Sequence, residues 1–157
     1  MKLSAHLSFA ELACWNRLGR EWKQWAPGAM VETYPLEWSA DRAVRLAANF
    51  EEIRHALGDL PIRINSGYRT PAYNAAVGGA KLSQHVQGRA IDIRHATLKP
   101  YDLFAKIRRM EKDGALPLLG GIGLYATFVH IDVRPRQANG RLAIWFGKGM
   151  ETKGGIG

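Results

Sequence analysis

The sequence holds one cysteine among 157 residues, and this scarcity excludes an internal disulfide. Cys14 stands in an apolar, helix-like segment beside Leu12 and Trp15, and no neighbour suggests a lowered pKa of its thiol. We expect it to be a small buried side chain. The usual covalent brace of small oxidised secreted domains is therefore missing.

Long hydrophobic runs are also missing. No stretch of about 18 apolar residues occurs, so the sequence predicts no transmembrane segment. The first residues lack the uninterrupted apolar core of a secretory signal. From this we expect synthesis in the cytoplasm without a signal peptide.

Acidic residues are in the minority: the sequence has 14 Asp and Glu and 22 Lys and Arg. The formal charge is therefore +8, and the pI is near 9.9. This balance favours anionic partners such as nucleic acids, phosphate-rich polymers or membrane surfaces. The basic residues are scattered and form no run with interleaved aromatics. We therefore expect no nucleic-acid binding.

The length fits a single domain over residues 1–157, with 46% hydrophobic residues to build a core. We divide it into an N-terminal helical part (1–58), a core (59–147) and a glycine-rich, flexible tail (148–157). Apolar periodicity and turn signals predict the following elements: a short helix capped by Ser8, helices over 39–57, 71–76 and 100–111 (the last capped from Thr97), and strands over 61–66, 88–94, 121–125, 128–133 and 142–146. The last two strands are expected to form a hairpin. This order predicts an α+β fold, a mainly antiparallel sheet with flanking helices.

The residues with the most distinctive chemistry gather around one stretch, in which His85 and Asp92 are seven positions apart. The glycine at position 88 lets the backbone turn sharply, so a loop histidine and a strand aspartate can approach one cation. Neutral imidazole and carboxylate are both zinc ligands. His130 lies in another strand-like segment, where alternation places it on the same face as Asp132. We therefore expect His85, Asp92 and His130 to form a metal site.

The same residues resemble a known family. The pattern Ser83-x-His85-x-x-Gly88-x-Ala90-x-Asp92, followed downstream by a histidine on a hydrophobic strand, is similar to the M15 zinc peptidases that trim bacterial cell-wall peptides. These are D-Ala-D-Ala carboxypeptidases and related endopeptidases. The resemblance covers roughly residues 60 to 146 and includes Ser66–Thr70, Gly78–Ala80 and Gly120–Tyr125.

The resemblance implies a Zn²⁺ cofactor on His85, Asp92 and His130. Three protein ligands leave the fourth tetrahedral position to water, as in catalytic zinc sites. The fold implied is that of the DD-peptidases and of the Hedgehog signalling domain, which agrees with the α+β fold predicted above.

The resemblance also points to substrate-binding residues. Arg69 is expected to bind substrate, because its planar fork suits a carboxylate. Ser83 is a candidate hydrogen-bond donor to the substrate, or it fixes the loop that carries it. Tyr125 is a candidate stabiliser of an oxyanion, or it packs on its strand. His95 is a weaker candidate for carrying protons, with a surface position as the alternative.

The sequence departs from the family at one functional position. Many members carry a glutamate general base shortly before the last zinc histidine, where this chain has Thr127 and Phe128. The sequence resembles a subgroup with His-x-Asp at this place. Asp132 is then the candidate catalytic base, and its alternative role is to orient His130.

Together these features predict a zinc metallopeptidase that acts on peptidoglycan stem peptides or their cross-links, with anionic wall polymers as further partners. We expect it to be a monomer. The absence of a signal peptide would suit a phage or prophage endolysin that reaches the wall with help from another protein. The alternative function is a non-catalytic, zinc-bearing wall-binding module of the same fold.

Overall fold

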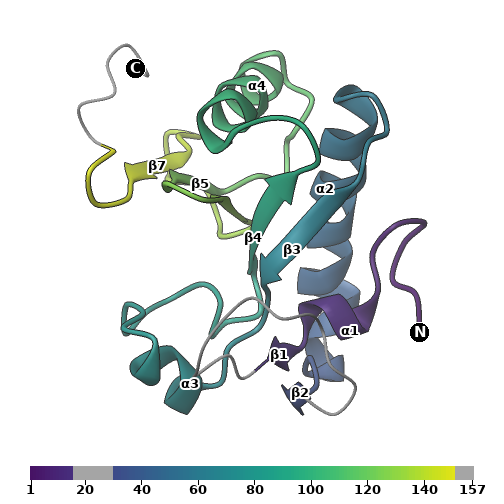
Figure 1. Cartoon of the computed structure of the whole chain (residues 1–157), viewed down its shortest axis with the longest axis vertical. Coiled ribbons are helices and arrows are strands. Elements are labelled where there is room, and N and C mark those ends of the chain that lie inside the picture. The colour runs from purple at the N-terminus through teal and green to yellow at the C-terminus, as the bar shows by residue number, and fades with distance from the viewer. Residues whose placement is uncertain (16–29, 151–157) are drawn as a thin grey trace.

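The computed structural model describes residues 1–15 and 30–150 (Figure 1). Their helices are α1 (Phe9–Leu12), α2 (Val44–Ala56), α3 (Pro71–Ala76) and α4 (Pro100–Lys112), with a 3₁₀ turn (Leu36–Trp38) and a π-helical turn (Ser39–Ala43) before α2. The strands are β1 (Cys14–Trp15), β2 (Met30–Glu32), β3 (Ile62–Ser66), β4 (Ala90–His95), β5 (Gly121–Leu124), β6 (Val129–Asp132) and β7 (Ala143–Phe146). Residues 151–157 of the expected flexible tail lie outside the described residues.

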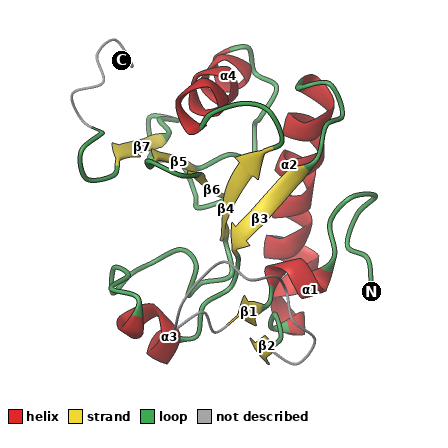
Figure 2. Cartoon of the chain, viewed as in Figure 1, coloured by secondary structure: helices red, strands yellow, loops and turns green. Residues whose placement is uncertain are grey.

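The strands that carry the candidate site belong to one five-stranded sheet with the order β3-β4-β6-β5-β7. Neighbours from β3 to β5 are antiparallel, and β7 runs parallel to β5 at one edge (Figure 2). The predicted α+β fold with a mainly antiparallel sheet is confirmed. The hairpin predicted between the last two strands is wrong, because β7 passes β6 and pairs with β5.

Strand alternation gives the sheet one apolar face and one polar face. On the apolar face, Ile91 and Ile93 of β4 and Ile131 of β6 are fully buried in the core. The helices α2 and α4 add apolar side chains to the same core, among them Phe50 and Phe104. Residues of even number on β4 and β6 therefore point to the opposite face, away from the core.

The helix ends mostly follow the predicted capping signals. Ser8 and Glu11 form a capping box at α1. Thr70 caps α3, whose first residue is Pro71. The cap predicted for α4 is wrong: Lys99 occupies the N-cap position without a side-chain bond, because Pro100 already begins the helix there.

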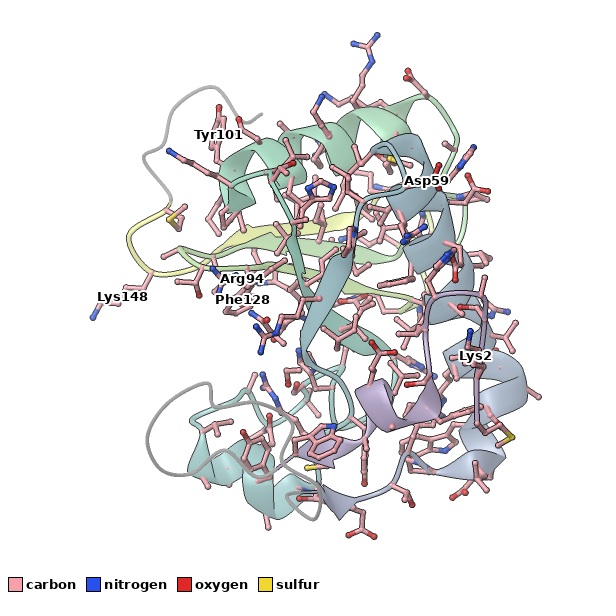
Figure 3. The ribbon with its side chains drawn as sticks, turned by 45° about the vertical axis from the view of Figure 1, so that its right-hand side comes forward. Lys2, Asp59, Arg94, Tyr101, Phe128 and Lys148 are labelled. Carbon is pink, nitrogen blue, oxygen red and sulfur yellow. The ribbon has the colours of Figure 1, made fainter. Side chains whose placement is uncertain are left out.

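Cys14 is buried, as predicted, but in strand β1 instead of a helix, where its sulfur accepts a hydrogen bond from the backbone N–H of Thr70. Exposed side chains such as Tyr101 on α4 and Lys148 beyond β7 extend outwards from the ribbon (Figure 3). Over the described ranges, no helix combines the length and the apolar character needed to cross a bilayer.

Candidate metal centre

Three buried side chains on the polar face of the sheet bring their ligand atoms together. His85, Asp92 and His130 each offer one such atom, and these atoms lie within 4.8 Å of one another. Nε2 of His85 and Nδ1 of His130 are both 3.1 Å from Oδ1 of Asp92. The structure thus unites the three residues that the sequence predicts as metal ligands.

Backbone pairing explains why they meet. Asp92 on β4 stands directly opposite His130 on β6 in the antiparallel register, so their side chains share a face. His85 comes from the loop before β4, and Gly88 at φ +67° turns that loop back onto the strand. A side chain at position 88 would also collide with the Trp38 ring, since a Cβ there would lie 2.4 Å from it.

The hydrogen bond at its other nitrogen fixes the tautomer of His85. Nδ1 lies 2.7 Å from the carbonyl oxygen of Gly67, which can only accept, so Nδ1 carries the hydrogen. Burial lowers the pKa of His85 and keeps the ring neutral. Nε2 therefore turns a lone pair toward the carboxylate of Asp92, and a cation between these two atoms would satisfy both.

His130 is held in a comparable way by a carboxylate. Its Nε2 donates to Oδ2 of Asp132 at 2.8 Å, while Nδ1 faces Asp92. Burial opposes ionisation of Asp132, but hydrogen bonds from His130 and Arg134 outweigh it and lower the pKa of Asp132 to about 2. Arg134 donates to both carboxylate oxygens, with Nη2 at 2.7 Å from Oδ2. Asp132 is thus an ionised, fully buried partner of a ligand histidine.

Arg69 lies on the other side of Asp92. Its Nη2 donates to Oδ2 of Asp92 at 3.4 Å, Nε to Ser66 at 3.1 Å and Nη1 to Asn74 at 3.3 Å. Burial works against the charge on Asp92, but His85 and His130 outweigh it and hold the pKa of this carboxyl far below its usual range. These contacts engage three of the five N–H donors of the guanidinium, and the residues that the structure describes leave the other two unbonded.

An open cavity of about 470 Å³ exposes the cluster to solvent, and its wall includes the remaining predicted residues, Ser83 and Tyr125. Ser83 also fixes its loop, because its hydroxyl accepts a hydrogen bond from the backbone N–H of His85 at 3.2 Å. The hydroxyl of Tyr125 accepts one from Nε1 of Trp145 at 2.8 Å. An acceptor bond of this kind leaves the hydrogen of the Tyr125 hydroxyl available to a ligand.

His95 is not part of the centre. It ends β4, and its Nδ1 accepts hydrogen bonds from the backbone N–H groups of Thr97 and Leu98. Its neighbourhood is a separate cavity lined by Thr97, Lys99 and Leu103. The histidine therefore orders the turn before α4.

Three residues at the centre were not found by sequence reasoning. Arg134 stands two positions after Asp132, so continued alternation was the signal that could have placed it beside that carboxylate. Asn74 on α3 and Trp145 on β7 gave no such signal. The ring centroids of Trp145 and His130 are 4.9 Å apart. This contact depends on the pairing of β7 with β5, which the sequence did not predict.

Two imidazoles and a carboxylate are a donor set that zinc accepts, and the second nitrogen of each histidine is bonded to an acceptor, as ligand histidines require. Among the described residues no other group of three or more His, Cys, Asp or Glu could hold a metal ion. Donor set and open cavity together fit a catalytic type of metal centre.

Comparison with known proteins agrees with this class. A sequence model described as Peptidase M15 matches residues 5–132, which is most of the chain and includes the three ligands. The zinc D-Ala-D-Ala carboxypeptidase of Streptomyces albus G is 46% identical over 91 residues, a match that covers 56% of this chain and 31% of that protein. The chain belongs to the M15 family of zinc peptidases, and the resemblance noted in its sequence is confirmed.

Proposed function

We propose that this chain is a zinc-dependent peptidase that hydrolyses peptide bonds in peptidoglycan stem peptides or cross-links. The observation that carries the proposal is the convergence of His85, Asp92 and His130 in an open cavity of an M15 chain. A similar protein that is a zinc D-Ala-D-Ala carboxypeptidase supports the substrate class. A lytic, endolysin-like role is a finer form of the same proposal.

The three ligands would hold zinc through Nε2 of His85, a carboxylate oxygen of Asp92 and Nδ1 of His130. Bound there, zinc supplies a water of lowered pKa and polarises the scissile carbonyl. The chain itself orients the ligands: the Gly67 carbonyl fixes the ring of His85, and Asp132 fixes the ring of His130.

Substrate is positioned by the residues around the cluster. Arg69 binds a substrate carboxylate with the two N–H groups that its neighbours leave free, while Ser66, Asn74 and Asp92 keep the fork in place. The hydroxyl of Tyr125 donates to the developing oxyanion, because Trp145 occupies its acceptor side. Both groups act through hydrogen bonds in a partly buried cavity, where such bonds are stronger than in water.

For Asp132 the geometry favours the orienting role over that of general base. The carboxylate is fully buried, accepts a hydrogen bond from His130 and accepts hydrogen bonds from Arg134 at both of its oxygens. It is also not part of the wall of the open cavity, whose lining carboxylate is that of Asp92. A general base must reach the proton it removes, directly or through one water. We therefore assign Asp132 to holding His130.

The decisive experiment combines metal content with product analysis. Alanine at His85, Asp92 or His130 should reduce bound zinc from about one per chain to nearly none and abolish cleavage of defined muropeptides. The matched control is His55→Ala, because that side chain is on α2, is 80% exposed and does not line the open cavity. Mass spectrometry of the products identifies the bond that is cut.

The outcomes separate the proposal from its alternative. A chelator should stop release of D-alanine or of cleaved muropeptides, and added zinc should restore it. Stoichiometric zinc in His130→Ala would reject the ligand assignment. Zinc binding and wall binding without any cleaved product would instead identify a non-catalytic wall-binding module.

A further inference from the structure

A second, larger hollow is lined by α4 and by β7, the edge strand of the sheet. Figure 1 shows where these two elements lie. It encloses about 840 Å³. Its walls come from the last turns of α4, from the loop before β7 and from β7 itself, with Arg108, Lys112, Arg141, Ile144 and Trp145 among the lining residues. We call this hollow the α4–β7 groove.

The α4–β7 groove is positively charged. Glu111 is the acidic residue in its lining, and it is neutralised by Arg108 at 3.2 Å and by Arg136 at 3.1 Å. Lys112 and Arg141 are exposed on the walls, and neither has an acidic partner among residues 1–15 and 30–150. Two cationic groups without an acidic partner among the described residues face the groove, so an anionic ligand would complement it.

The groove and the catalytic cavity have one lining residue in common. Trp145 belongs to the walls of both hollows. Its ring contacts His130 in the metal centre, and its indole N–H bonds to Tyr125. Because β7 is the edge strand of the sheet, a polymer bound at the metal centre would pass Trp145 and cross this edge to reach the α4–β7 groove. The exposed side chain of Ile144, at 40% of its full area, adds an apolar contact along that path.

From these observations we propose that the α4–β7 groove binds a carboxylate-bearing segment of the same wall polymer whose peptide lies at the metal centre. The proposal rests on the proposed function for the identity of the polymer. Carboxylates suit Arg141 and Lys112 in charge, and covalent continuity with the bound peptide raises their effective concentration at the groove. The groove would then select polymeric substrate over short free peptides.

The experiment is sedimentation of the full chain with purified sacculi from which phosphate-containing polymers have been removed. Lys112→Glu/Arg141→Glu is compared with Lys99→Glu/Lys106→Glu, which makes the same charge change at exposed residues of the α4 region outside the groove. Zinc content and melting temperature confirm that each variant is folded. At low salt, the apparent dissociation constant should rise about tenfold for the groove pair and less than about twofold for the control pair.

Three results would overturn the proposal. Equal losses in both pairs would show that net charge governs retention. If the protein sediments with sacculi only when the phosphate-containing polymers are present, the groove binds those polymers and not a carboxylate-bearing segment. A dimer that the groove variant converts to monomer would identify a second copy of the chain as the occupant.

The groove and the proposed function fail in distinguishable ways. Suppose that the wild-type protein cleaves no defined muropeptide, and that only the Lys112→Glu/Arg141→Glu variant loses sacculus binding. Catalysis is then rejected and the groove proposal stands. If it cleaves muropeptides and both pairs bind sacculi like wild type, the groove is rejected and catalysis stands.

Discussion

At the scale of single residues, His85 and Asp92 present hydrogen-bond acceptors to each other. The neutral ring of His85 has given its N–H to the Gly67 carbonyl, and its lone pair faces an ionised Asp92. Buried acceptors that face one another are costly unless a cation joins them. The hydrogen bonds and charge states of His85 and Asp92 favour a metal here, and residue spacing in the sequence could only suggest it.

The role of Asp132 is decided by Asp132→Asn. If the carboxylate orients His130, we expect zinc affinity to fall about 10- to 100-fold and turnover to return when zinc is in excess. A general base predicts the reverse pattern, in which zinc stays bound and turnover falls by about 10² to 10⁴. Turnover and metal content at saturating zinc distinguish the two.

The control for that comparison is Asp113→Asn, which removes an exposed carboxylate paired with Arg109. It should change neither zinc affinity nor turnover, since exposed ion pairs contribute little. Low turnover of Asp132→Asn with a full complement of zinc would overturn the orienting role.

At the scale of elements, β5 makes room for side chains from the strands on either side. A Cβ at Gly121 would lie 2.5 Å from Oδ2 of Asp132, and a Cβ at Gly123 would lie 2.5 Å from Nε1 of Trp145. A side chain at either position would occupy space on the polar face that the Asp132 carboxylate and the Trp145 indole fill. Steric room, more than backbone freedom, explains glycine at both positions.

This steric account predicts the effect of Gly123→Ala. The added methyl group should displace the Trp145 ring, break its hydrogen bond to Tyr125 and lower the free energy of unfolding by about 1–3 kcal/mol. Urea unfolding measures the loss. Combining it with Trp145→Leu, which removes the obstructing ring, should cost less than the sum of the single changes. Simple additivity would mean that the methyl group does not meet the indole.

The strands also show how far local patterns reach. Alternation predicted β3, β4 and β6 and put His130 and Asp132 on one face, because a side-chain period of two is a local property. Asp92 shares that face through the register of β4 with β6, which alternation does not give. The pairing of β7 is not local. The turn before it suggested a hairpin, but the chain crosses to the far side of β5, and only that position brings Trp145 over the centre.

At the scale of the whole molecule, the candidate ligands were predictable from the sequence, but the residues that support them were not. The three ligands lie in short motifs whose spacing is meaningful, and the structure brings them together. Asn74 reaches Arg69 from α3, and the Gly67 carbonyl reaches His85 across 18 positions of the chain. Contacts of this kind depend on tertiary packing, which periodicity and propensity do not encode.

The N-terminal segment is held to the domain by a polar tie that is unrelated to the metal centre. The carboxylate of Glu51 on α2 accepts hydrogen bonds from the hydroxyl of Ser4 at 2.7 Å and from the backbone N–H of His6 at 2.8 Å. Burial would raise the pKa of Glu51, but these hydrogen bonds, together with the contact between Nδ1 of His6 and the Glu51 carboxylate at 2.8 Å, outweigh it and lower the pKa below its usual value. The tie therefore links the first residues of the chain to the helix that covers the core.

The tie predicts a specific dependence of stability on pH. Because the folded pKa of Glu51 is lowered, its contribution is complete above the unfolded value of about 4.3 and is lost as pH falls through the lower folded value. Glu51→Gln should thus reduce the free energy of unfolding by about 1 kcal/mol at pH 7 and by clearly less near pH 3. Urea unfolding at both pH values tests this, with Glu52→Gln as the control, since its carboxylate is the exposed neighbour on α2. A deficit in Glu51→Gln that is equal at the two pH values would show that the ionised carboxylate is not what holds the segment. Zinc release in acid affects both variants alike, so only a difference between them reports on the tie.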